Sequence, residues 1–259
     1  MKRPCIFCQQ FRKLTEEHLW SDWIGKLFGE KEEYTVQRRL PDGQLRQWET
    51  VGLNQTATVV CEKCNNEWMS EIETETKPVI CDLMKYGYPL SFLPIGIAAL
   101  AAFTFKNAII SEHTHRKRKP FFAVSDRVLF MNKLRIPDGV QMWMASSGSD
   151  RFSGVFHSYA FKIDAPPGPL RDTEFLSFTW SAGYLVLQVL APRWKRYVRR
   201  HEPLALLKPN ERWESVSVRF WPNDGRPVTW NPTYDLSGNA LEVFKNRWTA
   251  PVNVPFRRI

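Results

Sequence analysis

Two pairs of closely spaced cysteines are the residues whose type and spacing point most directly to a defined chemistry. Cys5 and Cys8 are separated by two residues, and so are Cys61 and Cys64. That gap lets both sulfurs of a pair reach one ion, and four thiolates are what a tetrahedral structural zinc site requires. A redox-active dithiol, the alternative reading, would need only one pair. The pattern therefore predicts a structural Zn²⁺ held by all four cysteines.

A second set of residues could support catalysis. Zinc closed by four sulfurs has no open position and cannot activate water, so hydrolysis would need a separate site. Glu17 and His18 follow the first cysteine pair, and Asn65 comes directly after the second. A histidine can take a proton from water near neutral pH, while carboxylate and amide oxygens suit a hard divalent cation. The fifth cysteine, Cys81, is expected to be a buried apolar residue.

Two short segments carry a resemblance to a known family. Residues 14–20 (LTEEHLW) and 60–70 (VCEKCNNEWMS), with the cysteine pair at 5–8, resemble a branch of bacterial HNH endonucleases that have a ββα-metal core. The resemblance covers about residues 5–73. It implies a treble-clef-like, zinc-stabilised nuclease module at the N-terminus, and it says nothing about the remaining two-thirds of the chain.

The resemblance also implies roles for individual residues. His18 would be the general base, Glu17 and Asn65 would bind a catalytic Mg²⁺ or Mn²⁺, and Asn54 would orient the base. DNA rather than RNA is the expected substrate on family grounds alone. The sequence departs from the family pattern at Ser21, where a proline is common, and at Asn65, where histidine is the stronger metal ligand.

The charge distribution is uneven. The chain of 259 residues carries a net charge of +9, although its first 90 residues hold 12 basic and 14 acidic residues and so contribute −2. The remainder contributes +11, which is compatible with a polyanionic partner or with a merely solvated basic surface. The candidate phosphate contacts fall in two basic stretches, made of Arg116, Lys117, Arg118, Lys119, Lys195, Arg196, Arg199 and Arg200.

The sequence also bears on location. It shows no secretory signal, and the longest apolar stretch, residues 92–110, is interrupted by Thr104, Lys106 and Asn107. Such a stretch favours a buried core helix over a membrane span. We therefore expect a cytoplasmic protein without membrane contact, a compartment in which cysteines bind metal rather than form disulfides.

Hydrophobic periodicity and turn residues predict an α+β fold in three parts. These are the HNH-like zinc module (1–85), a helical connector with a basic end (86–119) and a β-rich α+β C-terminal domain (120–259). In the first part we expect a helix from a Thr15 cap to Gly29, a hairpin over 34–48 turning at 41–43, a strand over 57–60 and a helix from Asn65 that Pro78 kinks. Farther on, the patterns predict a helix over 125–134 and strands over 140–145, 154–163, 175–180, 184–190 and 216–221.

Two other functions are compatible with these patterns. The zinc module could bind nucleic acid or protein without catalysis, which requires only the four cysteines and the basic second part. Alternatively, the C-terminal region could sense a ligand or partner while the zinc module provides the output. The late tryptophans, Trp213, Trp221, Trp230 and Trp248, are expected in the core rather than at a binding surface.

Overall fold

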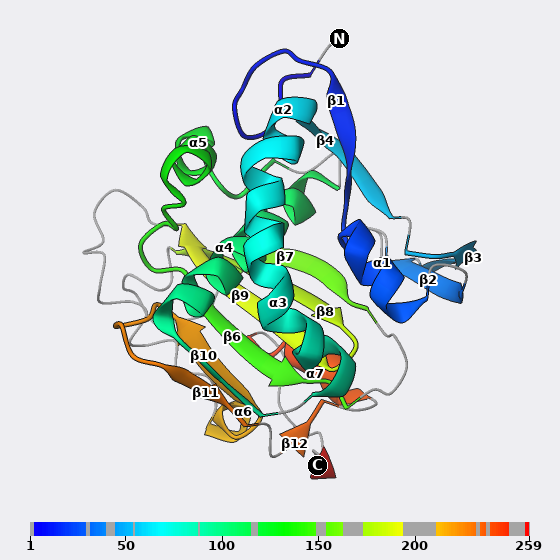
Figure 1. Cartoon of the computed structure of the whole chain (residues 1–259), viewed down its shortest axis with the longest axis vertical. Helices are drawn as coiled ribbons and strands as arrows, with labels where there is room; N and C mark the ends of the chain where they lie inside the picture. The colour runs from blue at the N-terminus through cyan, green and yellow to red at the C-terminus, as the bar shows by residue number, and fades with distance from the viewer. Residues whose placement is uncertain are drawn as a thin grey trace.

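The computed structural model shows a mixed α+β fold, as predicted (Figure 1). It describes residues 3–29, 32–39, 45–53, 55–87, 89–114, 119–148, 154–162, 173–193, 211–231, 234–236, 239–248 and 257–258. The helices are α1 (Asp22–Phe28), α2 (Glu62–Cys64), the π-helix η1 (Asn65–Met69), α3 (Ser70–Tyr86), α4 (Pro94–His113), α5 (Val124–Lys133), α6 (Glu211–Glu214) and α7 (Asn239–Lys245).

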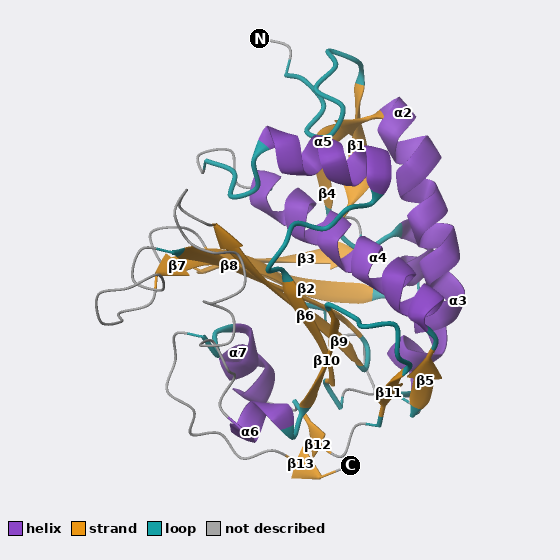
Figure 2. Ribbon diagram, turned by 90° about the vertical axis from the view of Figure 1, so that its left-hand side faces the viewer, coloured by secondary structure: helices purple, strands orange, loops and turns teal. Residues whose placement is uncertain are grey.

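A seven-stranded sheet forms the larger, C-terminal part of the described chain, in the order β13-β12-β6-β9-β8-β7 with β10 pairing with β6. Its strands are β6 (Gln141–Ser146), β7 (Phe156–Lys162), β8 (Glu174–Ala182), β9 (Leu185–Arg193), β10 (Ser217–Trp221), β12 (Tyr234–Asp235) and β13 (Arg257–Arg258). The five strands predicted for this region are confirmed, with small differences at their ends. Helices α3 and α4 lie over one face of the sheet, and α6 and α7 over the other (Figure 2).

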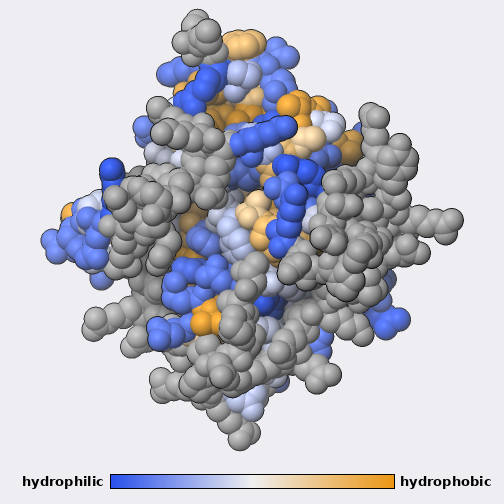
Figure 3. Space-filling model, turned by 180° about the vertical axis from the view of Figure 1, so that it is seen from behind, coloured by the Kyte–Doolittle hydropathy of each residue, from blue (hydrophilic) through white to orange (hydrophobic). Residues whose placement is uncertain are grey.

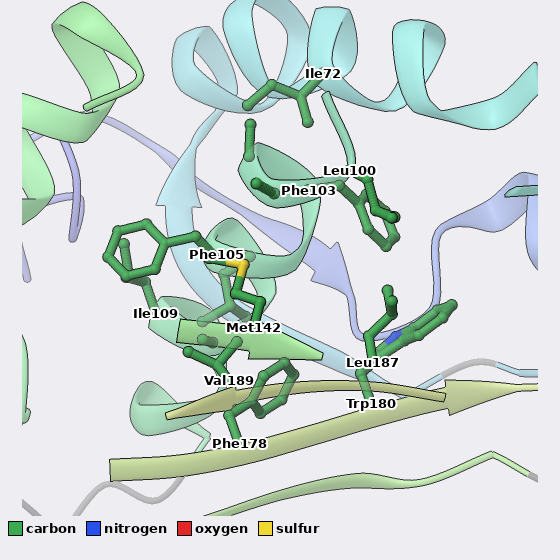
Figure 4. Close-up of a cluster of buried hydrophobic side chains, with 14 of the residues drawn as sticks. Ile72, Leu100, Phe103, Phe105, Ile109, Met142, Phe178, Trp180, Leu187 and Val189 are labelled. Atoms are coloured by element: carbon green, nitrogen blue, oxygen red, sulfur yellow. The ribbon is translucent and has the colours of Figure 1, made fainter. Parts of the chain in front are cut away.

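Helix α4 is the centre of the main hydrophobic core. Phe103 and Phe105 from this helix pack with side chains from α3 and from the sheet, including Trp180 and Val189 (Figure 4). Helix α4 is long and apolar enough to cross a membrane. This is weak evidence for a membrane span, because buried core helices meet the same criteria, and 72% of the most apolar window of α4 is buried in the fold. The cluster of buried side chains to which α4 belongs runs from the N-terminal cysteines to Trp230.

The N-terminal part contains a two-stranded sheet followed by a helix. Strand β1 (Leu14–His18) pairs antiparallel with β4 (Thr56–Cys61), and the chain then enters α2, η1 and α3, with non-helical backbone at Glu67. Between β1 and β4 lie α1 and a hairpin of β2 (Glu33–Arg39) and β3 (Leu45–Val51). The hairpin is confirmed, whereas its predicted turn at 41–43 lies outside the described residues.

Two local predictions in this part were wrong. Residues 15–18 form a strand rather than the start of a helix, because the hydroxyl of Thr15 donates to the carbonyl of Val60 on β4 instead of capping a helix. Helix α1 starts only at Asp22, although it does end at Gly29 as expected. Helix α3 passes through Pro78 without interruption, and the non-helical backbone lies earlier, at Glu67.

The ends of α3 and α4 follow from backbone chemistry. Gly87 ends α3 in the left-handed conformation, with φ of +66°, and its N–H donates to the carbonyl of Leu83. Pro94 starts α4, where its missing N–H costs no helical hydrogen bond. Between them, β5 (Leu90–Phe92) pairs with β11 (Val228–Trp230). Seen from behind, the described surface carries several separate hydrophobic areas among hydrophilic ones (Figure 3).

Candidate metal centre

Cys5, Cys8, Cys61 and Cys64 come together at one point, although 52 residues of chain separate the two pairs. Their four sulfurs all lie within 4.8 Å of one another, and the sulfurs of Cys8 and Cys61 are 3.7 Å apart. A tetrahedral ion with bonds of about 2.3 Å to sulfur sets its ligands about 3.8 Å apart. The donor set and the spacing thus fit a four-cysteine zinc site, as the spacing in the sequence predicted.

Local hydrogen bonds shape the loop that carries Cys5 and Cys8. Gln9 has a positive φ of 59°, and its side-chain amide donates to the carbonyls of Cys5 and Ile6 at 3.1 and 2.9 Å. The N–H of Ile6 donates to Val59 on β4, and Arg127 of α5 donates to the carbonyl of Ile6 at 2.9 Å. These contacts fix the loop beside the end of β4, where Cys61 begins the second pair.

Within the cysteine cluster the pKa of Cys5 is lowered, whereas the pKa values of Cys8 and Cys64 are raised. A hydrogen bond from the thiol of Cys64 lowers the pKa of Cys5 to about 4, and the backbone N–H of Cys61 also donates to the sulfur of Cys5. Burial raises the pKa of Cys8. A thiolate in a mostly buried cluster of four sulfurs is stabilised by a nearby positive charge, and a bound metal ion would supply that charge. The remaining thiol, Cys81, is half-buried on α3 outside this cluster.

Glu17 lies near this centre but is engaged by an ammonium group. Its side chain is 5% exposed, and its Oε1 accepts a hydrogen bond from the Nζ of Lys106 on α4 at 3.1 Å. The same Nζ donates to Oε1 of Glu73 on α3 at 2.5 Å. Burial lowers the pKa of Lys106, but the two carboxylates outweigh that effect and raise it above its usual value. Lys106 is therefore a buried cation bridging two acids.

The other two residues of the predicted catalytic set lie in different surroundings. Asn65, at the start of η1, donates through Nδ2 to the hydroxyl of Thr15 at 3.3 Å. His18 is the last residue of β1 and is half-buried. The fold brings Asn65 against Thr15 of β1. Among the described hydrogen bonds, none joins His18 to Asn65 or to Glu17.

Several predicted residues lie outside the described part of the chain. These are Asn54 and the basic residues Arg116, Lys117, Arg118, Lys195, Arg196, Arg199 and Arg200. Lys119 is described and exposed, beside a small hollow that Glu112 and Phe121 also line.

Trp213 and Trp230 are buried core residues as expected, while Trp221 and Trp248 are partly buried at the edges of hydrophobic clusters.

Sequence reasoning missed Glu73 and Lys106. Lys106 carried a signal, because a lysine within an otherwise apolar helix must either reach solvent or find a buried anion. Its side chain is 0% exposed, so it does not reach solvent and instead pairs with a buried carboxylate. Glu73 lies on α3, in the first turn of that helix, and is joined to β1 through Lys106, which also bonds Glu17. No family model matches the chain, and no curated protein or solved structure matches it either.

Proposed function

We propose that the N-terminal part of this protein is a zinc-stabilised ββα module of the HNH type that binds nucleic acid without hydrolysing it. The observation that carries the proposal is the four-cysteine cluster, which joins the loop at 5–8 to the end of β4. Around it, the antiparallel pair β1–β4 leads directly into a helix. This order of two strands and a helix is what the resemblance of residues 5–73 implies.

Electrostatics favour binding over hydrolysis. A Mg²⁺ or Mn²⁺ site needs anionic oxygen ligands that are free to face the ion. The carboxylate of Glu17 is instead buried and bonded to Lys106, whose positive charge would repel a second cation nearby. Among the described residues, the four cysteines are the group of three or more His, Cys, Asp or Glu side chains that lies close enough together to hold a metal ion. The positive net charge lies after residue 90, so most of the phosphate contacts of a bound nucleic acid would come from the chain that follows the zinc module.

Hydrolysis is the second candidate function, and one observation favours it. His18 is the last residue of β1 and is half-buried, so part of its side chain is open to solvent. A half-exposed imidazole at the end of a strand could take a proton from water. This candidate would need a divalent cation brought by the substrate, or a rearrangement that releases Glu17 from Lys106.

One experiment separates the two candidates. The zinc-loaded protein is incubated with supercoiled plasmid and with short duplex DNA, in Mg²⁺ or Mn²⁺, and both cleavage and binding are measured. We expect binding that weakens with added salt, no cleavage, and the same binding by His18→Ala. Cleavage by the wild type that His18→Ala abolishes, at unchanged zinc content, would establish the nuclease instead. Absence of both binding and cleavage, tested also on RNA, would refute both candidates.

A further inference from the structure

The face of the large sheet that α7 covers contains a buried arginine. Arg247 follows α7 and is 6% exposed. Its Nη1 donates to the hydroxyl of Ser217 on β10 at 3.0 Å. Its guanidinium lies over the rings of Trp143, Phe244 and Trp248, with its central carbon 4.8, 4.3 and 4.6 Å from their centroids. The guanidinium is thus held in place from several sides.

Half of this guanidinium has no partner among the described residues. The Nε and Nη2 atoms of Arg247 are buried and make no hydrogen bond within that part of the chain. No carboxylate in the described part of the chain pairs with the side chain. Burial lowers the pKa of Arg247 to about 9, and only Tyr159 opposes that effect. A buried charge without a counter-ion is strongly unfavourable, so its presence needs an explanation beyond packing.

The two free donors lie on the same edge of the guanidinium. Nε–H and Nη2–H point side by side and form the fork that binds two oxygens of a carboxylate or phosphate. The third nitrogen, Nη1, is the one already used by Ser217. The aromatic rings cover the faces of the group and leave this edge as its remaining polar surface.

Other unpartnered polar atoms occur on the same side of the sheet. The indole N–H of Trp248 and the hydroxyl of Ser177 are buried donors without partners. Ser177 shares its sheet face with Thr179, whose hydroxyl accepts from the amide of Gln188. That amide also donates to the carbonyl of Phe244 on α7, while its own oxygen is a buried acceptor without a partner. Most of these unpartnered atoms are hydrogen-bond donors, which suit an anionic ligand. The acceptor, the side-chain oxygen just described, suits a ligand that also carries a proton next to its anionic group.

We propose that Arg247 anchors a site for a small ligand, in which the Nε–Nη2 edge binds a carboxylate or phosphate group on the α7 side of the sheet. The burial of Arg247 excludes a nucleic-acid backbone as the ligand, because a continuous chain of phosphates cannot enter so enclosed a place. The site would give the C-terminal sheet a ligand-sensing role. It does not depend on the function proposed for the zinc module.

Thermal unfolding of the full, zinc-loaded chain tests this proposal. Sodium phosphate and sodium acetate are titrated separately at constant ionic strength, with chloride as the balancing anion. Saturable binding should raise Tm by about 3 to 6 °C at tenfold excess over Kd. A rise with phosphate alone identifies a phosphate ligand, and a rise with acetate alone a carboxylate. No saturable rise with either anion overturns the proposal.

Three variants make the test specific. Arg247→Met should lose the rise in Tm while being at least as stable as the wild type without added anion, because a buried unpaired charge has been removed. Arg247→Lys keeps the charge but lacks the fork, and should weaken anion binding at least tenfold by isothermal titration. The control Arg226→Met removes an arginine that is 84% exposed and should leave the rise unchanged. An undiminished rise in both Arg247 variants would also overturn the proposal.

Discussion

The ammonium of Lys106 lies 3.1 Å from the carboxylate of Glu17 and 2.5 Å from that of Glu73. One buried cation from α4 thus joins β1 to α3. Replacing Lys106 with Met would leave two acids facing each other with no cation between them. Removing one partner of a buried ion pair typically costs about 3 to 5 kcal/mol, and we expect a loss of that size in chemical denaturation.

Two further variants show whether charge is the cause. In Lys106→Met with Glu17→Gln and Glu73→Gln, the buried charges are gone, and most of the lost stability should return. Lys26→Met breaks an exposed pair with Asp22 and should change stability by less than about 0.5 kcal/mol. If the triple variant were no more stable than Lys106→Met alone, lost packing rather than unpaired charge would explain the effect.

Zinc content and stability should both depend on the four cysteines. We expect one zinc per chain by elemental analysis, and a lower Tm after removal by a strong chelator, since metal bound only by the folded state stabilises that state. Cys64→Ser should lose zinc and show the same lower Tm without chelator. Cys81→Ser should keep its zinc, because Cys81 lies outside the cluster. Full zinc occupancy in Cys64→Ser would contradict the assignment of the centre.

The parts of this structure that could be predicted are those fixed by short-range pattern. The spacing of the cysteines predicted the four-cysteine cluster, and the alternation of β-branched and aromatic residues predicted strands such as β8 and β9. Residues 15–18 were misjudged because Thr15 suits both a helix cap and a strand. Its role depends on Val60, 45 residues away, to which it donates a hydrogen bond.

The pairing of charged groups could not be predicted for the same reason. Lys106 meets Glu17 across 89 residues, and no local pattern links them. Nor does the order of elements reveal that α4 packs against β7, β8 and β9. The unpartnered donors of Arg247 likewise depend on which aromatic rings surround it, a matter of tertiary packing.

A turn between β8 and β9 provides a test of close packing. Gly183 has a φ of +55°, and a Cβ built there would collide with the backbone carbonyl of Met84 on α3. The neighbouring Tyr184 donates its N–H to that same carbonyl at 2.9 Å. Because backbone cannot move aside as a side chain can, Gly183→Ala should cost about 2 to 4 kcal/mol in denaturant unfolding. In the matched control Gly25→Ala, where no atom lies within 4 Å of the new Cβ, stability should be retained or slightly increased.

The neighbours Glu112 and His113, at the end of α4, should affect the pH dependence of stability in opposite ways. Burial raises the pKa of Glu112 from 4.5 to about 7, so the native state holds a proton that the unfolded state releases, and stability falls as pH rises through this window. Burial, with the charge of Arg127, lowers the pKa of His113 from 6.5 to about 4. The unfolded state then binds the extra proton, and this contribution to stability is lost as pH falls from 6.5 towards 4.

Between pH 4.5 and 6.5 these two contributions nearly cancel, whereas separate variants should reveal each one. Glu112→Gln leaves the histidine contribution, so the free energy of unfolding should rise by about 1 kcal/mol per pH unit relative to the wild type across this range. His113→Gln should show the opposite slope. Denaturant unfolding at half-unit pH steps measures the slope for each variant. Subtracting the free energy of unfolding of the wild type at each pH removes the contributions of all other groups. Parallel curves for the wild type and Glu112→Gln would mean that Glu112 ionises in the folded protein near its ordinary pKa.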